Sequence, residues 1–285
     1  VTGGLRDQAP WSTVALRQLS GTLRGVPVEL NGAAEFADQK LQLSQLSLAS
    51  GESRLRVSGR VDVGPAVAWD LSLQGERLDP AIAWPEWPGQ LELQAGVTGG
   101  MDEGAPRLQL DIATLAGSLR DQPLSLTGRA GYAGGQVSLQ GIALDSGPNR
   151  LRLGGEIAET LDLDLKLDAP DLAASWPGLS GRLQGEGRIS GMRQAPTLST
   201  RLEAEALAYR AQAVGRLQAV IDWNQGQPEA DIEARALALG GQAVQRLQAT
   251  PRGVPERHQG RPPSAASGLR VRAAVAGGWA AASRD

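Results

Sequence analysis

The stretch Leu161-Asp162-Leu163-Asp164-Leu165-Lys166-Leu167-Asp168 alternates apolar and charged side chains without interruption. Successive side chains of a β-strand point to opposite faces of a sheet, so the leucines of this stretch share one face and the charges share the other. The pattern predicts a strand with one apolar face and one face in water.

Shorter copies of the same alternation recur along the chain. Pairs rich in glycine and asparagine, such as Asn31-Gly32 and Gly134-Gly135, separate them and are typical of tight turns between antiparallel strands. The sequence therefore predicts a meander of strands of roughly 6–10 residues. Helical spacing competes only at residues 201–207 and 229–239, where strands are still favoured.

The chain also repeats itself. Leu19-Ser-Gly-Thr-Leu-Arg-Gly-Val-Pro-Val-Glu-Leu-Asn-Gly returns as Leu115-Ala-Gly-Ser-Leu-Arg-Asp-Gln-Pro-Leu-Ser-Leu-Thr-Gly, and the match continues without a gap until Gly59 falls on Gly155. Such self-similarity is the signature of an array of supersecondary units. We predict β repeats of about 90 residues over 1–99 and 100–190, with a partial third repeat over 191–249.

Residues 250–285 depart from this pattern. They contain six arginines and four prolines against two acidic residues, Glu256 and Asp285. This composition predicts a disordered or linker-like basic tail, and a frameshift in the gene is the interpretation we favour. Contact of the tail with anionic lipid headgroups is the alternative.

The composition excludes several functions. A net charge of −3 is not that of a nucleic-acid-binding surface, and the chain of 285 residues has no cysteine and one histidine, His258. Asp162, Asp164 and Asp168 share a strand face and could gather a hard cation, but a solvated charged face is the preferred interpretation. We predict no catalytic residue, no metal ligand and no cofactor, and hence no enzyme.

An antiparallel sheet with one apolar face must pack that face on another sheet, coil into a solenoid, or leave an open trough. A trough is favoured over a closed core. The residues expected to line it are Leu41, Leu43, Leu55, Val57, Leu71, Leu73, Leu124, Leu126, Val137, Leu139, Leu151, Leu153, Leu161, Leu163, Leu165 and Leu167.

Two Trp-Pro-Gly segments lie near the ends of the repeats. Proline and glycine interrupt a strand ladder, so Trp87 and Trp176 are expected to plug an edge of the trough or a strand crossover. A gating or lipid-contact role is the alternative for these two side chains.

The run Asp168-Ala-Pro-Asp-Leu-Ala-Ala-Ser-Trp-Pro-Gly-Leu-Ser-Gly-Arg-Leu-Gln-Gly-Glu-Gly-Arg-Ile-Ser-Gly191 resembles the TamB family of Gram-negative bacteria. So does the segment Ala195-Pro196-Thr-Leu-Ser-Thr-Arg-Leu-Glu-Ala-Glu-Ala-Leu207. The resemblance covers about residues 1–249 and is to the central repeat region, which makes the chain a fragment of a longer protein.

The resemblance implies an AsmA-like, elongated and curved antiparallel sheet, a U-shaped trough of the β-taco kind, in an inner-membrane-anchored protein that crosses the periplasm. It implies phospholipid acyl chains in the trough, transport between the two membranes, and assembly of outer-membrane proteins with a barrel partner, TamA, of the Omp85 class. The alternative is a structural β-solenoid or sandwich stalk, or a protein-binding module of the adhesin type.

Overall fold

The computed structural model describes residues 1–6, 9–23, 25–102, 104–224, 227–239, 242–252 and 268–275. Two compact units compose it, residues 1–145 and residues 146–285. Both are built almost entirely from antiparallel strands, which confirms the predicted all-β class.

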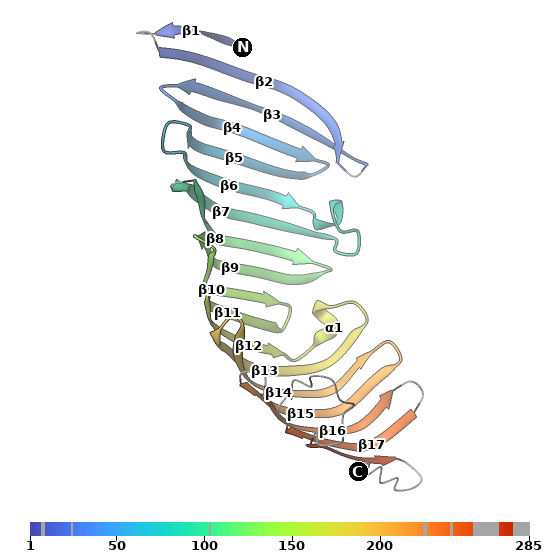
Figure 1. Ribbon diagram of the computed structural model, residues 1–285. Coiled ribbons are helices and arrows are strands. Elements are labelled where there is room, and N and C mark those ends of the chain that lie inside the picture. The colour runs from blue at the N-terminus through green and yellow to red at the C-terminus, as the bar shows by residue number, and fades with distance from the viewer. Residues whose placement is uncertain are drawn as a thin grey trace, which may run out of the picture. The chain divides into compact units, whose positions relative to one another are not determined.

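In unit 1 each strand pairs with the next strand of the chain, as Figure 1 shows. A short 3-10 helix, η1, spans Pro80–Ile82 between the sixth and seventh strands. The strands are β1 Thr2–Arg6, β2 Ala9–Leu23, β3 Val26–Ala37, β4 Lys40–Ser50, β5 Ser53–Asp62, β6 Ala68–Leu78, β7 Gly89–Asp102, β8 Ala105–Leu119, β9 Gln122–Ala133 and β10 Gln136–Ser146, the last ending one residue past the unit boundary.

Unit 2 continues with the same antiparallel neighbour pairing. A single helical turn, α1, spans Leu172–Ser175 between its second and third strands. The strands are β11 Asn149–Ile157, β12 Thr160–Ala169, β13 Leu179–Met192, β14 Ala195–Tyr209, β15 Gln212–Asn224, β16 Gln227–Leu239, β17 Gln242–Arg252 and β18 Gly268–Val275.

Many strands are longer than the expected 6–10 residues, reaching 15 residues in β2, β8 and β14. The reason is the β-bulge, which adds one residue to a strand and restores the facing of the side chains beyond it. In β4, the register shifts between Leu43 and Leu46, so both keep their side chains on one face. Alternation read from the sequence stops at each bulge, although the strand continues.

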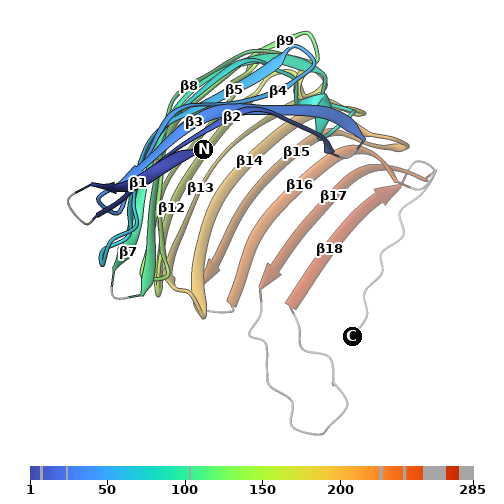
Figure 2. The same cartoon turned by 90° about the horizontal axis from the view of Figure 1, so that it is seen from above.

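The two segments with helix-like spacing are strands with a local backbone irregularity, which in β14 is accompanied by a register shift. Residues 201–207 and 229–239 lie in β14 and β16, and each contains a residue in the left-handed conformation, Ala206 with φ 50° and Ala236 with φ 52°. Because bulges bend and twist a strand, the strands of each unit curve along their length (Figure 2).

The sequence repeat is visible in the elements. Strands β2, β3 and β4 begin at Ala9, Val26 and Lys40, and β8, β9 and β10 begin 96 residues later at Ala105, Gln122 and Gln136. Strands β14 and β15 follow β8 and β9 at an offset of 90 residues. The boundaries of the repeats at residues 99, 190 and 249 stay predictions.

Part of the segment predicted to lack structure is folded. Strand β17 runs to Arg252, and β18 pairs with it antiparallel, Leu269 opposite Pro251 and Val271 opposite Ala249. The alternation Leu269-Arg270-Val271-Arg272 is a strand pattern that the arginine and proline content of the segment concealed. Residues 253–267, with His258, and 276–285 lie outside the described residues.

The buried side chains are few and mostly small. Among the described residues, the buried hydrophobic ones are Leu91, Ala95, Ala169, Leu172, Ala204, Ala219, Ala230, Ala234 and Leu237, and none of the larger side chains is less than 2% exposed. Each strand is held by its ladder hydrogen bonds and by contacts within one sheet layer, not by a thick core.

Candidate functional site

The strand register of unit 2 aligns apolar side chains in unbroken rows across the sheet. Because paired residues of antiparallel strands share a face, the rows together form one surface, named here the apolar face of unit 2. One row is Leu151, Leu167, Gly185, Leu202, Ala219, Ile232 and Ala249, and the next is Ala169, Leu183, Ala204, Leu217, Ala234 and Leu247. A third is Gly155, Leu163, Ile189, Leu198 and Trp223.

Unit 1 has an apolar face of the same construction. Its central rows are Ala34, Leu43, Gly59, Leu71, Val97, Leu110 and Ala130, then Leu46, Val57, Leu73, Ala95, Ile112 and Gly128, then Leu30, Leu48, Leu55, Gly75, Leu93, Leu115 and Leu126. These rows contain glycine and aliphatic residues only, so the middle of the face has no ring and no polar side chain.

The register places all but two of the residues predicted to line a trough on these apolar faces, in the rows above or in rows two residues away. Val137 and Leu139 lie half-buried in β10, 96 residues after Leu41 and Leu43. The strand alternation was therefore sufficient to assign the facing of these leucines. Their contact with a ligand stays a prediction.

Neither apolar face is covered by a second layer of described residues, because the extensive contacts of each strand are with its neighbours in the sheet. The predicted lining residues are half-buried, and Leu165 is 41% exposed. A dry, closed core would leave such leucines almost fully buried. Both faces therefore present aliphatic side chains that are open to a further molecule.

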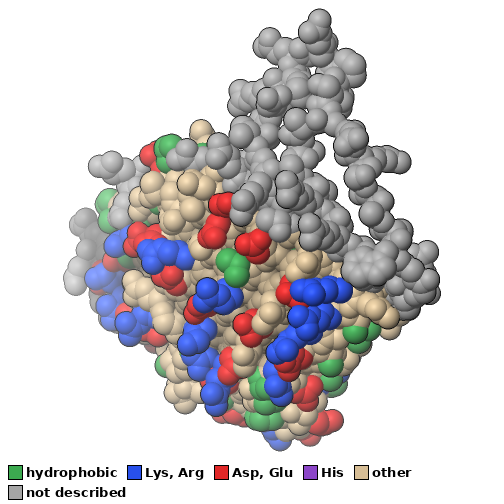
Figure 3. All heavy atoms as spheres, turned by 90° about the horizontal axis from the view of Figure 1, so that it is seen from below, with side chains coloured by type: hydrophobic (Ala, Val, Ile, Leu, Met, Phe, Trp, Pro, Cys, Tyr) green, Lys and Arg blue, Asp and Glu red, His purple; other side chains and the backbone are tan. Residues whose placement is uncertain are grey.

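The opposite face carries the charges, in ladders of alternating sign. Arg188 donates to Asp162 at 2.6 Å and lies 3.4 Å from Asp164, and Gln184 donates to Asp168 at 3.1 Å. Figure 3 shows basic and acidic side chains interleaved on one face, with few hydrophobic ones. The carboxylates considered as cation ligands, Asp162, Asp164 and Asp168, thus bind Arg188 or the side-chain amide of Gln184. No group of three or more potential metal ligands occurs among the described residues.

One ionisable group of this face has a shifted pKa. The hydrogen bond donated by Arg235 lowers the pKa of Glu233 below its ordinary value of 4.5; partial desolvation opposes the shift, and the charges of Arg235 and Arg246 add to it. The guanidinium groups lie 2.7 Å and 3.1 Å from the carboxylate. This is the pattern of a surface ion network.

The two helical connections share a hydrogen-bonded capping arrangement that was not recognised in the sequence. The carboxylate of Asp79 accepts from the amide of Ala81 and caps η1, and that of Asp171 accepts from the amide of Ala173 and caps α1. A buried polar side chain holds each capping residue from a neighbouring strand. Ser53 accepts from the amide of Asp79 at 2.9 Å, and Asn149 accepts from that of Asp171 at 3.1 Å.

Ser53 and Asn149 are the buried polar residues of the described chain, and they lie 96 residues apart, at the same position of the repeat. Gly51 and Gly147 lie in the turns that precede them, and both residues lie within the sequence match noted above. Two polar residues occupy one repeat position, each about 25 residues before a capping aspartate. This recurrence is the signal in the sequence that would have located the capping arrangement.

Trp87 and Trp176 lie in the connections that follow these helices. The guanidinium of Arg120 lies 5.7 Å from the centre of the Trp87 ring, and Trp176 is 56% exposed. Trp87 shortly precedes β7, and Trp176 shortly precedes β13. Their action as plugs stays a prediction.

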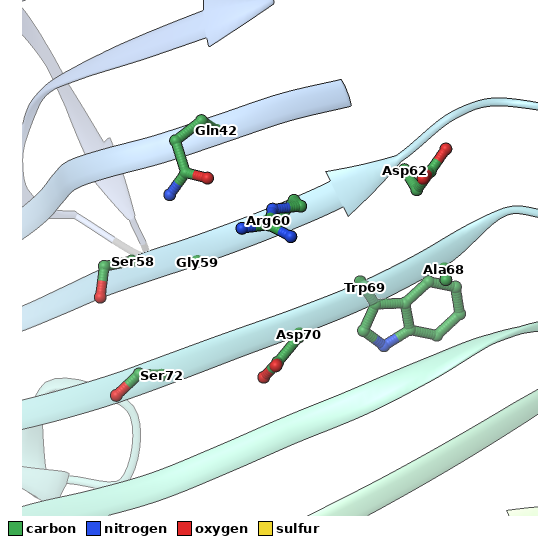
Figure 4. A pocket seen from close by; sticks show the side chains of 9 residues that line it. All are labelled: Gln42, Ser58, Gly59, Arg60, Asp62, Ala68, Trp69, Asp70 and Ser72. Carbon is green, nitrogen blue, oxygen red and sulfur yellow. The ribbon is translucent and has the colours of Figure 1, made fainter. Parts of the chain in front are cut away.

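The charged face also has a shallow recess of about 440 Å³ in unit 1. Figure 4 shows its polar lining, which comes from β4, β5 and β6. The polar side chains are Gln42, Ser58, Arg60, Asp62, Asp70 and Ser72, and Ala68 and Trp69 complete the lining together with Gly59. Its charges are of both signs, so it resembles ordinary polar surface between strands.

No helix among the described residues is long and apolar enough to cross a membrane.

Residues 16–284 match the family model described as TamB, N-terminal domain. The chain is also 27% identical over 181 residues to the translocation and assembly module subunit TamB of Haemophilus influenzae. This match covers 63% of the chain and 14% of the relative's length. No solved structure matches the chain significantly.

These matches bear on the place of the chain within the family. The matching model is that of the N-terminal domain, whereas the repeat pattern was interpreted as the central region. The match extends to residue 284, and the origin of the arginine-rich segment by a frameshift stays a prediction.

Proposed function

Because this chain belongs to the TamB family, we propose that its apolar faces form part of a groove that carries phospholipid acyl chains between the inner and the outer membrane. The whole protein would be anchored in the inner membrane, cross the periplasm of a Gram-negative bacterium, and assist assembly of outer-membrane proteins with a barrel partner of the TamA type. The anchor and the partner contacts would belong to other segments of that protein. The proposal assigns no catalysis to the chain.

The observation that carries the proposal is the row structure of the apolar faces. Aliphatic rows run without a polar interruption from β11 to β17, and the same holds from β3 to β9. A continuous surface of this kind lets an acyl chain pass from strand to strand without meeting a charge. An acyl chain that moved from one row to the next would exchange its apolar contacts for equivalent ones. The apolar area that it buries would therefore stay nearly constant.

The composition of the rows suits a mobile ligand. Apart from Trp223 at the end of one row, aliphatic residues and glycine provide area but no fixed aromatic pocket, so no single position along the central rows binds a chain much more tightly than its neighbours. Exposed aliphatic area of this extent is uncommon on soluble monomers and usually marks an interaction surface. Acyl chains in contact with it would remove that area from water.

Site-specific photo-crosslinking tests the proposal. A photoreactive amino acid at Leu153 or Leu163, on the apolar face of unit 2, is expected to capture phospholipid in cells. The matched control is Asp164, next to Leu163 in the same strand but on the charged face. Equal capture from both faces would contradict the proposal.

A closed structural stalk makes the opposite prediction. Its apolar rows would be dry, so the purified chain would carry no phospholipid. Mass spectrometry of lipid extracted from the folded chain distinguishes the two functions, with bound phospholipid expected for the groove.

A further inference from the structure

The aromatic side chains of the described chain are confined to the strand ends. In unit 1, Phe36, Trp69 and Tyr132 share the outermost row of the apolar face, next to the turns that follow β3, β5, β7 and β9. We name this edge the turn rim. Each unit has an opposite edge, which we name its helix rim. In unit 1 it holds η1 and the turn after β8, with Trp84 and Trp87, and in unit 2 it holds α1 and the turn after β14, with Trp176 and Tyr209.

Amphipathic rings at both edges of an aliphatic strip are the arrangement found where an apolar layer meets water. On β9, the strip extends from Leu124 near the helix rim to Tyr132 at the turn rim, eight residues further along the strand. At about 3.3 Å per residue, this is roughly 26 Å. An acyl chain needs about 15 Å, half the hydrocarbon thickness of a bilayer, and therefore fits along a strand between the rims.

The helix rim also carries an arginine at one position of successive repeats. Arg120 follows β8 and Arg210 follows β14, 90 residues later, and the sequence has Arg24 at the corresponding position, outside the described residues. Arg120 and Arg210 adopt the left-handed conformation, with φ 52° and 55°. Asparagine and glycine are favoured in such turns, so arginine is placed there at some conformational cost.

Both guanidinium groups lie against an aromatic ring at this rim. The distance from the guanidinium carbon to the ring centre is 5.7 Å for Arg120 over Trp87 and 5.1 Å for Arg210 over Tyr209. Stacking leaves the edge of a guanidinium, where its donors are, directed away from the ring.

Neither arginine is paired with a carboxylate of the described residues. Arg129 and Arg216, on the charged faces, bind Asp111 and Glu205. The Nη1 atom of Arg120 is buried and has no hydrogen-bond acceptor in the described chain. A buried donor without a partner costs free energy, which an oxyanion that reached Arg120 would recover.

We infer that Arg120 and Arg210 bind the phosphate of phospholipid headgroups at the helix rim, with the acyl chains lying along the strands toward the turn rim. The inference rests on the proposed function and deepens it, since it gives the ligand an orientation and a charged anchor in each unit. The anchors recur with the repeat, so each unit offers a site of the same chemistry.

Two lipids with the same fluorescent tails test the anchor on the chain of 285 residues. One is phosphatidylglycerol, and the other is diacylglycerol, which lacks the phosphate. The Arg120→Gln, Arg210→Gln double variant is expected to bind phosphatidylglycerol about tenfold more weakly and diacylglycerol as tightly as the wild type does. The matched control is the Arg129→Gln, Arg216→Gln variant, which removes two arginines from the charged faces and should leave both affinities unchanged.

The outcomes separate this inference from the proposed function. Unchanged phosphatidylglycerol binding by the double variant would overturn the phosphate anchor while diacylglycerol binding still supports the groove. Absence of binding of either lipid to the wild-type chain would overturn both. The Arg120→Lys, Arg210→Lys variant keeps the charge and is expected to recover most of the phosphatidylglycerol affinity, which excludes misfolding as the cause of the loss.

Photolabelled lipids test the orientation independently. A phosphatidylglycerol with a photoreactive headgroup is expected to label peptides that contain Gln122, at the helix-rim end of β9. One with the photoreactive group at the tail terminus should label peptides toward Tyr132. The reversed labelling pattern would overturn the orientation.

Discussion

At the scale of single residues, glycine decides where neighbouring strands approach most closely. Gly155 has φ 126°, and a Cβ atom there would lie 1.8 Å from the carbonyl oxygen of Asp162 in the neighbouring strand. Gly59, 96 residues earlier, has φ 139° and a similar obstruction, 2.1 Å from the carbonyl oxygen of Asp70. The repeat therefore preserves a backbone requirement as well as a hydrophobic pattern.

We expect Gly155→Ala to lower the free energy of unfolding by ~3 kcal/mol, because the strand must shift or the conformation must change. Gly96→Ala is the control, since a Cβ atom at Gly96 meets nothing within 4 Å and φ there is not left-handed. Urea unfolding followed by circular dichroism measures both variants. A loss of similar size in the two would contradict the steric explanation.

A second prediction at this scale concerns pH. The pKa of Glu233 is lowered in the folded chain, so its ion pairs contribute stability above the ordinary value of 4.5, and that contribution is lost as the pH falls through the lowered pKa. The Glu233→Gln variant should therefore be slightly less stable than the wild type at about pH 7 and closer to it at about pH 3. Thermal unfolding of both proteins at the two pH values measures this, and a difference that grows on acidification would refute it.

At the scale of elements, buried polar anchors hold the helical connections to the sheet. The side-chain amide of Asn149 donates at 2.6 Å to the carbonyl oxygen of Asp171 and at 2.6 Å to the hydroxyl of Ser175, and its oxygen accepts from the amide of Asp171. Asn149 is 6% exposed, so water cannot replace these bonds without opening the edge of the sheet. One side chain thereby fixes both ends of α1.

Replacing Asn149 with alanine leaves buried donors and acceptors without partners, and we expect it to destabilise unit 2 by about 2–3 kcal/mol. Proteolysis should then begin in the connection at residues 170–178. Asn224→Ala is the control, because Asn224 is exposed and its contact with Thr197 is 3.4 Å long. Undiminished resistance of the Asn149→Ala chain to protease would show that α1 is held by its apolar contacts alone.

At the scale of the whole molecule, each unit exposes an apolar face with no second layer among the described residues. Such a face should tolerate a charge much better than a closed core does. Leu163→Asp is expected to lower the stability by ~1 kcal/mol, compared with 3 kcal/mol or more, roughly, for a charge buried in a dry core.

The control for this substitution is Ala204→Asp, on the same face but 1% exposed, where a severe loss of stability is expected. Chemical unfolding of the two variants, without lipid, measures the difference. Severe destabilisation by Leu163→Asp would indicate that a further layer covers the face and would weaken the case for a groove.

Much of this molecule could be predicted from the chain alone. The alternation from Leu161 to Asp168 established the strand and the facing of its leucines, because side chains of a strand can only alternate. The repeat predicted recurring elements, and the offset of 96 residues between β2–β4 and β8–β10 agrees with it. The match of the family model is in line with the resemblance recognised in the segment from Asp168 to Gly191.

The remaining features depend on contacts between strands, which one sequence does not display. A bulge such as that at Ala206 changes the alternation by one residue, so local periodicity suggested a helix where the ladder keeps β14 extended. The strand at 268–275 was missed because pairing with β17 outweighs the composition around it. In the same way, the meeting of Asn149 with Asp171, and of Arg120 with Trp87, arises only when the register brings distant strand ends together. The sequence determined which side chains share a face; the tertiary structure decided which of them become neighbours, because hydrogen-bond register and not chain proximity sets those distances.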